Sequence, residues 1–447
     1  MSLDVFDELQ TFCDDNNYID VADKLPIFIC SVGAHLFNAL NKCHYCPFDP
    51  DSDANLAALA DTSVPDPFLI HNCPLRHSGD PIYTPMSHLA DTRLHILIRG
   101  MKGSGKNVLI DLFLKEGTGL LWNAHSFSGL GYRTDIGPNS ITEAGMFGSV
   151  NDEGEIVGRP LAREMCGGFL GIEEFSSLTD ASKKEHSKDM KNQLLGSTDS
   201  GRVKKAMRSG WVEYMTRYTI WGGTQPGRFE LESGLDRRFF IIDIEMTAEK
   251  EQAYKRAQSL ASNMGIEHRI KQAEKVQMLR GWFIRRQENA VLNPPRQLKF
   301  DDSLSEWLMQ EGVRSFESDL FRRVAIGYWM MQENYSPDPD LHITIDDRLK
   351  VILDDSLKMR RVVMDSDVQL IKSTFWDSEI YRSDLLKEVA RMITNGDYQS
   401  AKRWVEENLV NQVWYAEYKE SKEGRGRRGI MARIGPTLEK KEKLQWS

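Results

Sequence analysis

The chain has 447 residues, of which 28% are charged and 40% hydrophobic, with a formal net charge of −9. This length fits two or three domains, and the composition excludes a disordered chain, a coiled-coil rod, a collagen-like repeat and a small disulfide-linked scaffold. No stretch reaches the roughly 20 apolar residues that cross a membrane. Six cysteines fit a reducing compartment, so we expect a cytoplasmic or nucleoid-associated protein without a secretory signal.

Charge and pattern divide the chain into three expected parts. Residues 1–90 contain three Lys and Arg against thirteen Asp and Glu, a net of −10, and five of the six cysteines. Residues 91–335 alternate strand-like and helix-like segments, which favours an α/β core. A Pro/Asp-rich segment at 334–340 indicates a linker, and residues 341–447 are expected to form a C-terminal region.

A candidate metal site lies in the acidic N-terminal part. Cys-x-x-Cys followed by Cys-x₃-His supplies four ligands of the kind that zinc prefers: Cys43, Cys46, Cys73 and His77. His44 and His71 are rival ligands. The pattern therefore predicts either a zinc site or thiols that bind no metal.

The strongest local signal is GMKGSGKN at residues 100–107, between a predicted strand, Leu94–Arg99, and a predicted helix, Val108–Lys115. Strand, glycine-rich loop and helix form the context of a phosphate-binding P-loop, in which Lys106 would reach the β- and γ-phosphates. Asn107 stands where Ser or Thr is usual, and its amide oxygen can still ligate Mg²⁺. The alternative is a glycine-rich turn without nucleotide. The residues predicted to bind nucleotide are Gly100, Gly103, Ser104, Gly105, Lys106, Asn107 and Val108.

Two carboxylates follow the next buried strand-like segment, Gly168–Ile172. Adjacent Glu173 and Glu174 repel each other unless a cation lies between them or one faces solvent. Because a P-loop ATPase needs a carboxylate at the end of a second strand, we expect Glu173 to bind Mg²⁺ and Glu174 to activate water. A solvated turn is the alternative.

Polar residues also flank two later strands. The segment Tyr218–Pro226 contains Gln225, whose amide is a candidate for contact with the γ-phosphate. Arg237 and Arg238 directly precede an apolar run. At a subunit edge, such arginines could stabilise transition-state charge on a neighbour's nucleotide, with surface ion pairing as the alternative.

The order of these motifs resembles AAA+ ATPases, and in particular the minichromosome maintenance (MCM) helicases of the branch with a β-hairpin before sensor 1. The resemblance spans about residues 90–330 and is carried by HILIRGMKGSGKN, ITEAGMFGSV, GGFLGIEEFSSL and the segment from GRVKKAMR to GLDRRF. The chain departs from the family pattern at Asn107, Glu173 and Gln225, where Ser, Asp and Asn are usual. Viral superfamily-three helicases share the branch and are the second choice.

The resemblance implies an AAA+ core with a helical lid, and a DNA-contacting hairpin at Gly201–Arg208. In the family, a Lys at the hairpin tip follows the DNA backbone, which makes Lys204 and Lys205 the candidates. Four cations without a carboxylate independently suit phosphate contact, although a solvated basic loop is the alternative: Arg202, Lys204, Lys205 and Arg208. A second hairpin is expected around Asn151–Gly154.

The resemblance also implies a sensor-2 helix at Arg314–Arg323, with Arg314 in the matching position, although a helix held by surface ion pairs is an equal alternative. Ninety N-terminal residues leave little room for the oligonucleotide-binding barrel of MCM proteins, so we expect none.

Residues 365–435 are predicted to form a winged helix. Its elements are two helices, a strand, a basic turn at 422–429 and a return strand: Asp384–Ile393, Tyr398–Leu409, Val413–Lys419 and Ile430–Ile434. We expect three arginines in the turn to contact DNA, with a purely protein-binding module as the alternative: Arg425, Arg427 and Arg428.

We therefore predict an ATP-driven, ring-forming DNA helicase or translocase, expected as a hexamer and of viral or mobile-element type. ATP and Mg²⁺ are its expected cofactors, with Zn²⁺ if the N-terminal ligands bind a metal, and single-stranded or forked DNA is its expected partner. The alternatives are an AAA+ protein remodeller or loader tethered to DNA, and a nucleotide-sensing scaffold with weak hydrolysis. DNA-stimulated ATPase activity with strand displacement would distinguish the helicase from the protein remodeller. Phosphate release would distinguish either enzyme from the nucleotide-sensing scaffold.

Overall fold

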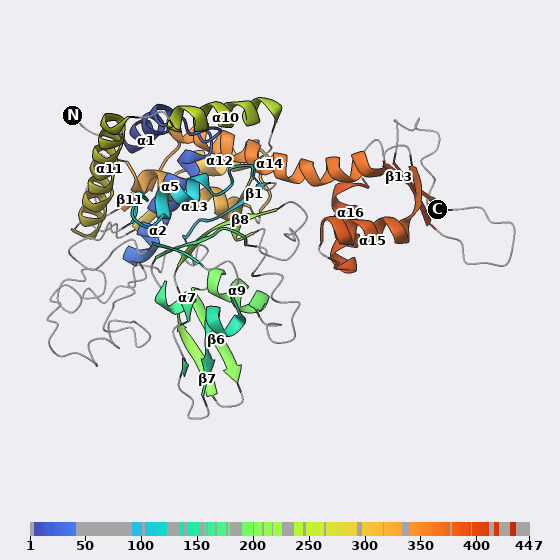
Figure 1. The fold of residues 1–447 in the computed structure, drawn as a ribbon. Helices are drawn as coiled ribbons and strands as arrows, with labels where there is room; N and C mark the ends of the chain where they lie inside the picture. The colour runs from blue at the N-terminus through green and yellow to red at the C-terminus, as the bar shows by residue number, and fades with distance from the viewer. Residues whose placement is uncertain are drawn as a thin grey trace. The chain divides into compact units, whose positions relative to one another are not determined.

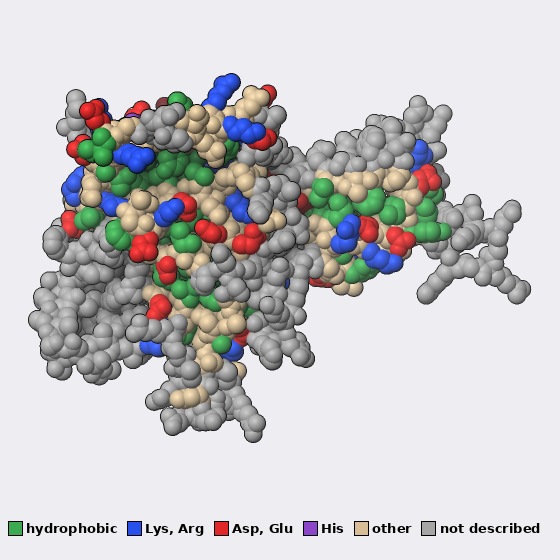
Figure 2. All heavy atoms as spheres, in the orientation of Figure 1, with side chains coloured by type: hydrophobic (Ala, Val, Ile, Leu, Met, Phe, Trp, Pro, Cys, Tyr) green, Lys and Arg blue, Asp and Glu red, His purple; other side chains and the backbone are tan. Residues whose placement is uncertain are grey.

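The computed structural model describes residues 4–434 apart from 42–91, 123–133, 179–189, 226–236, 333–339, 420–429 and gaps of one to four residues between elements. The chain divides into two compact units, residues 1–224 with 237–357, and residues 225–236 with 358–447. No helix in the described part of the chain is long and apolar enough to span a bilayer. Figure 2 shows cationic and anionic side chains of the described residues interspersed on the visible face.

A five-stranded parallel sheet forms the centre of the first unit (Figure 1). Its strands, in spatial order, are β2 (Thr134–Ile136), β5 (Phe169–Ile172), β8 (Thr219–Thr224), β1 (His95–Gly100) and β9 (Phe239–Ile244). β1, β5 and β8 are buried at every position, as expected for parallel strands that are covered on both faces. The predicted α/β core is confirmed, and the carboxyl ends of all five strands meet at one edge.

Short strand pairs and helices surround this sheet. The pairs are antiparallel β3 (Ser149–Val150) with β4 (Ile156–Val157), antiparallel β6 (Arg202–Met207) with β7 (Gly210–Met215), and parallel β10 (Gln297–Phe300) with β11 (Asp340–Ile343). The helices are α1 (Val5–Asp15), α2 (Leu25–Asn41), α5 (Val108–Leu114), α6 (Glu143–Phe147), α7 (Leu161–Glu164), α9 (Met190–Asp199), α10 (Ala248–Ser262), α11 (Ile266–Leu292), α12 (Asp302–Gln310), α13 (Ser318–Met330) and the first part of α14 (Asp347–Phe375).

The N-terminal helices belong to the same compact unit as the sheet. α2 is apolar on most of its faces, which is typical of a buried helix. The Ser31 hydroxyl donates a hydrogen bond to the Leu94 carbonyl (2.6 Å) and accepts one from the Trp221 indole (2.9 Å). These contacts tie α2 to β1 and β8. Residues 4–41 therefore pack in the same unit as the sheet, whereas the rest of the N-terminal domain expected over residues 1–90 lies outside the described residues.

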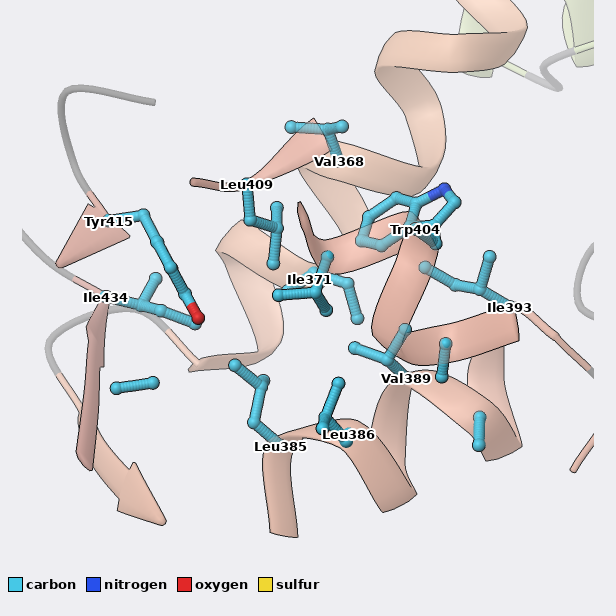
Figure 3. Close-up of a cluster of buried hydrophobic side chains, with 14 residues drawn as sticks. Val368, Ile371, Leu385, Leu386, Val389, Ile393, Trp404, Leu409, Tyr415 and Ile434 are labelled. Atoms are coloured by element: carbon cyan, nitrogen blue, oxygen red, sulfur yellow. The ribbon is translucent and has the colours of Figure 1, made fainter. Parts of the chain in front are cut away.

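The second unit contains the end of α14 and a small antiparallel sheet in the order β12-β14-β13. Its elements are β12 (Ser378–Tyr381), α15 (Arg382–Met392), α16 (Tyr398–Asn408), β13 (Tyr415–Lys419) and β14 (Ile430–Ile434). Figure 3 shows the side chains of Ile371, Val389, Trp404 and Ile434 within one core that helices and strands share. Both predicted helices and both predicted strands are observed, whereas β12 was not expected.

A stability prediction follows from the crossing of α2 and α13. A Cβ on Gly327 would overlap the backbone carbonyl of Cys30, so the two helices approach this closely only with glycine there. Gly327→Ala should therefore lower the free energy of unfolding by about 1–3 kcal/mol in thermal or urea unfolding.

Gly265→Ala is the matched control, because no atom lies within 4 Å of the position its Cβ would take. It should change the free energy of unfolding by less than about 0.5 kcal/mol. Equal stability of the two variants would contradict the assigned packing of α2 against α13.

Candidate functional site

The glycine-rich loop curls tightly between β1 and α5. Gly103 and Gly105 have φ angles of +84° and +82°, a region that side chains with a Cβ rarely adopt. Ser104 between them is buried against the end of β1, where a Cβ on Gly100 would contact its hydroxyl. Residues 103–107 therefore form the strand-to-helix turn that the sequence predicts.

The structure brings Lys106 together with Glu174. The Lys106 Nζ atom lies 3.3 Å from Glu174 Oε2, and the two side chains are 12% and 28% exposed. Because β8 lies between β1 and β5, the loops that follow β1 and β5 meet beside the end of β8. The Phe175 backbone N–H donates to the Gly223 carbonyl (2.6 Å), which fixes the loop after β5 against β8.

Three buried oxygens at this edge have no hydrogen-bond partner among the described residues: Ser104 Oγ, Asn107 Oδ1 and Thr224 Oγ1. Asn107 Oδ1 and the Glu173 carbonyl lie so near Gly223 that a Cβ there would be 2.7 and 2.6 Å from them. Buried polar groups are normally satisfied, so unsatisfied acceptors and hydroxyls gathered in one place indicate a ligand site.

The residues present also fit Mg²⁺. The amide oxygen of Asn107 is an acceptor without a hydrogen-bond partner among the described residues, and Glu173 adds a carboxylate in the adjoining loop. Mg²⁺ prefers oxygen ligands and commonly uses one or two protein groups together with phosphate oxygens and water. Among the described residues, no group of three or more His, Cys, Asp and Glu side chains is placed to hold a metal ion.

Arg237 and Arg238 lie at the opposite edge of the sheet. In the parallel register of β1 and β9, His95 pairs with Phe239 and Gly100 with Ile244, so Arg238 precedes the amino end of β9. A strand rises about 3.3 Å per residue, and Arg238 lies six residues before the level of Gly100, which puts its backbone roughly 20 Å from the glycine-rich loop along the sheet. Arg238 donates to Asp199 of α9 (2.8 Å), and Arg237 is exposed.

The structure also locates two further candidate residues, Gln225 and Arg314. Gln225 directly follows Thr224 at the end of β8 but belongs to the second compact unit. Arg314 is exposed and lies in the turn before α13, which begins at Ser318, so the expected helix starts four residues later than predicted.

The β6–β7 hairpin corrects the expected placement of Lys204 and Lys205. Lys204 pairs with Glu213 and Lys205 with Val212, and the pairing continues to Met207 with Gly210, so both lysines lie within β6 instead of at the tip. Lys205 forms an ion pair with Glu143 of α6, and both side chains are largely buried, whereas Lys204 is exposed. Arg202 begins β6. β3 and β4 form an antiparallel pair where the second hairpin was expected, around Asn151–Gly154.

The remaining predicted sites lie outside the described residues. These are the zinc ligands Cys43, Cys46, Cys73 and His77, and the basic turn with Arg425, Arg427 and Arg428. They stay predictions.

Comparison with known proteins gives no match, either to a family model or to a curated protein. The candidate site therefore rests on its own geometry and chemistry.

The ion pair between Lys205 and Glu143 gives a second prediction. Lys205→Ala would leave the Glu143 carboxylate buried without its cation, so it should lower the free energy of unfolding by about 3 kcal/mol. Lys204→Ala, on the exposed neighbour, should change it by less than about 0.5 kcal/mol. Equal melting temperatures for the two variants would argue against the buried pair.

Proposed function

We propose that the chain is an AAA+ ATPase that forms a ring and moves along or unwinds DNA, as its resemblance to MCM helicases implies. The observation that carries the proposal is the meeting of Lys106 and Glu174 beside the unsatisfied Asn107 oxygen, at the carboxyl edge of a parallel sheet. Ligands of open α/β sheets bind outside the carboxyl ends of the strands, which supports this edge as the nucleotide site.

Each residue of the site has a chemical task in hydrolysis. Lys106 neutralises charge on the β- and γ-phosphates, while backbone N–H groups of residues 103–107 face the phosphate oxygens. The Glu174 carboxylate orients the attacking water and takes its proton as the bond to the γ-phosphorus forms and the bond to the bridging oxygen breaks. When bound by Asn107 and Glu173, Mg²⁺ would supply further neutralisation of phosphate charge.

The position of Arg238 supports an active site shared between subunits. At the amino edge of the sheet, Arg238 is too far from the glycine-rich loop of its own chain to touch a bound γ-phosphate. In a ring, the same arginine can face the carboxyl edge of the next subunit, where it would stabilise transition-state charge.

Two features support DNA as the partner. The β6–β7 hairpin presents Lys204 to solvent, and a cation there suits contact with phosphates. The second unit has the order helix, strand, helix, helix, strand, strand, which supports a winged helix, with exposed Lys402 and Arg403 on α16.

A protein remodeller is the second candidate. The ion pair between Lys205 and Glu143 favours it, because this pair withdraws one hairpin cation from phosphate contact. Strand displacement by the full chain, measured with ATP on forked DNA, would support the helicase. ATP hydrolysis without displacement or translocation would favour the remodeller.

The hydrolysis site makes a direct prediction. Lys106→Ala should weaken ATP binding and lower turnover at least 100-fold, because it removes the cation that faces the phosphates. Glu174→Gln should keep ATP binding within a few-fold while abolishing phosphate release, since the amide cannot take a proton. Wild-type phosphate release by both variants would place the active site elsewhere.

The shared site predicts complementation in mixtures. Arg238→Ala should bind ATP but not hydrolyse it, and adding Glu174→Gln protein should restore part of the activity, because one interface then carries both wild-type residues. Arg237→Ala is the comparison, since Arg237 is the neighbouring candidate for the same role. An Arg238→Ala protein with full activity on its own would contradict the assignment.

A further inference from the structure

The last turn of α9 is fixed to the amino edge of the parallel sheet. Arg93, two residues before β1, is 1% exposed and donates hydrogen bonds to the carbonyls of Ser197 (3.2 Å) and Thr198 (3.4 Å). His95 at the start of β1 has its Nε2 atom 3.2 Å from the Thr198 carbonyl. Because the Ile220 backbone N–H donates to the other ring nitrogen (3.0 Å), Nε2 carries the proton and donates to that carbonyl. These buried bonds hold the end of the helix in one place.

Asp199 is the last residue of α9 and contacts Arg238 directly. Its carboxylate accepts a hydrogen bond from the Arg238 guanidinium (2.8 Å), and the two side chains are 60% and 21% exposed. A carboxylate at the carboxyl end of a helix faces the negative end of the helix dipole, so Asp199 by itself disfavours the helix. The Arg238 cation offsets this repulsion, which indicates that the two side chains act as a pair.

An arginine that acts on a neighbouring subunit gains from being held in place before the nucleotide arrives. A long side chain samples many rotamers, and fixing it during the reaction costs conformational entropy that a contact made in advance removes. Asp199 provides such a contact on the helix turn that Arg93 and His95 fix. One bond to Asp199 is compatible with phosphate contact, because a guanidinium carries five N–H donors.

We propose that Asp199 is a positioning residue for Arg238 and holds its guanidinium at the amino edge of the sheet, ready to face the γ-phosphate bound by the next subunit. In this role Asp199 acts on hydrolysis only through Arg238. It leaves ATP binding by its own chain unaffected, since the glycine-rich loop of that chain lies at the opposite edge of the sheet. The inference rests on the proposed function, because it takes from it the shared site to which Arg238 belongs.

The first test removes the charge of Asp199 and measures turnover and ATP affinity separately. Asp199→Asn should lower phosphate release at saturating ATP by about five- to tenfold, because a neutral amide holds the guanidinium less firmly than a carboxylate does. The Kd for a fluorescent ATP analogue should stay within about twofold of the wild-type value. Asp199→Glu keeps the charge and should recover most of the turnover. Glu306→Gln, the same loss of charge at an exposed position on α12, should leave both constants unchanged.

Mixing variants distinguishes a positioning role from a defect in the chain's own nucleotide site. In a ring of Asp199→Asn and Glu174→Gln chains, an interface with the glycine-rich loop of the first chain and Arg238 of the second carries every wild-type residue of the site. Phosphate release per Asp199→Asn chain should therefore rise several-fold, as it should for Arg238→Ala in the same mixture. The melting temperature of Asp199→Asn should fall by less than about 4 °C, since an exposed ion pair contributes little to stability.

The outcomes separate this inference from the proposed function. If Arg238→Ala stops phosphate release while Asp199→Asn releases phosphate at the wild-type rate or faster, the positioning role is wrong and the shared site stands. Loss of ATP affinity in Asp199→Asn as large as the loss of turnover would also overturn it, and so would rescue in the mixture for Arg238→Ala alone. If Arg238→Ala keeps full activity, the shared site fails and the inference fails with it.

Discussion

The close approach of Gly223 to two loops is the constraint on which the candidate site depends. A Cβ at this position would lie within 2.7 Å of the Glu173 carbonyl and of Asn107 Oδ1, so only glycine lets β8 end between the loops that follow β1 and β5. The hydrogen bond from the Phe175 N–H to the Gly223 carbonyl also joins the loop after β5 to the end of β8. The approach holds Asn107 beside the acidic loop, where Lys106 reaches Glu174.

The parallel sheet has a second consequence, because it separates the charged groups to which we assign roles in the proposed hydrolysis. Lys106 and Glu174 lie at the carboxyl edge, whereas Arg238 lies before the amino end of β9. A single chain therefore carries two complementary parts of the proposed site at opposite edges. Assembly in a head-to-tail ring would unite them at each interface.

Sequence patterns predicted the local features well. The strand, glycine-rich loop and helix around Lys106 occur within one or two residues of their predicted bounds, because local propensity and burial agree there. Long-range contacts were not predictable. The net acidic charge of residues 1–90 did not indicate the apolar helix α2 within them. No local pattern links Lys205 to Glu143, because the two lie 62 residues apart in the sequence. The contact of Arg238 with Asp199 likewise depends on tertiary packing that a sequence does not display.

The most direct test of the account is phosphate release from ATP by the full-length protein, measured with and without single-stranded DNA. We expect slow release by the protein alone and a several-fold increase on adding DNA, with no release by Glu174→Gln under either condition. Light scattering on the same samples should show assemblies larger than one chain. Absence of phosphate release in both conditions, or release that survives Glu174→Gln, would contradict the claim that this edge of the sheet hydrolyses ATP.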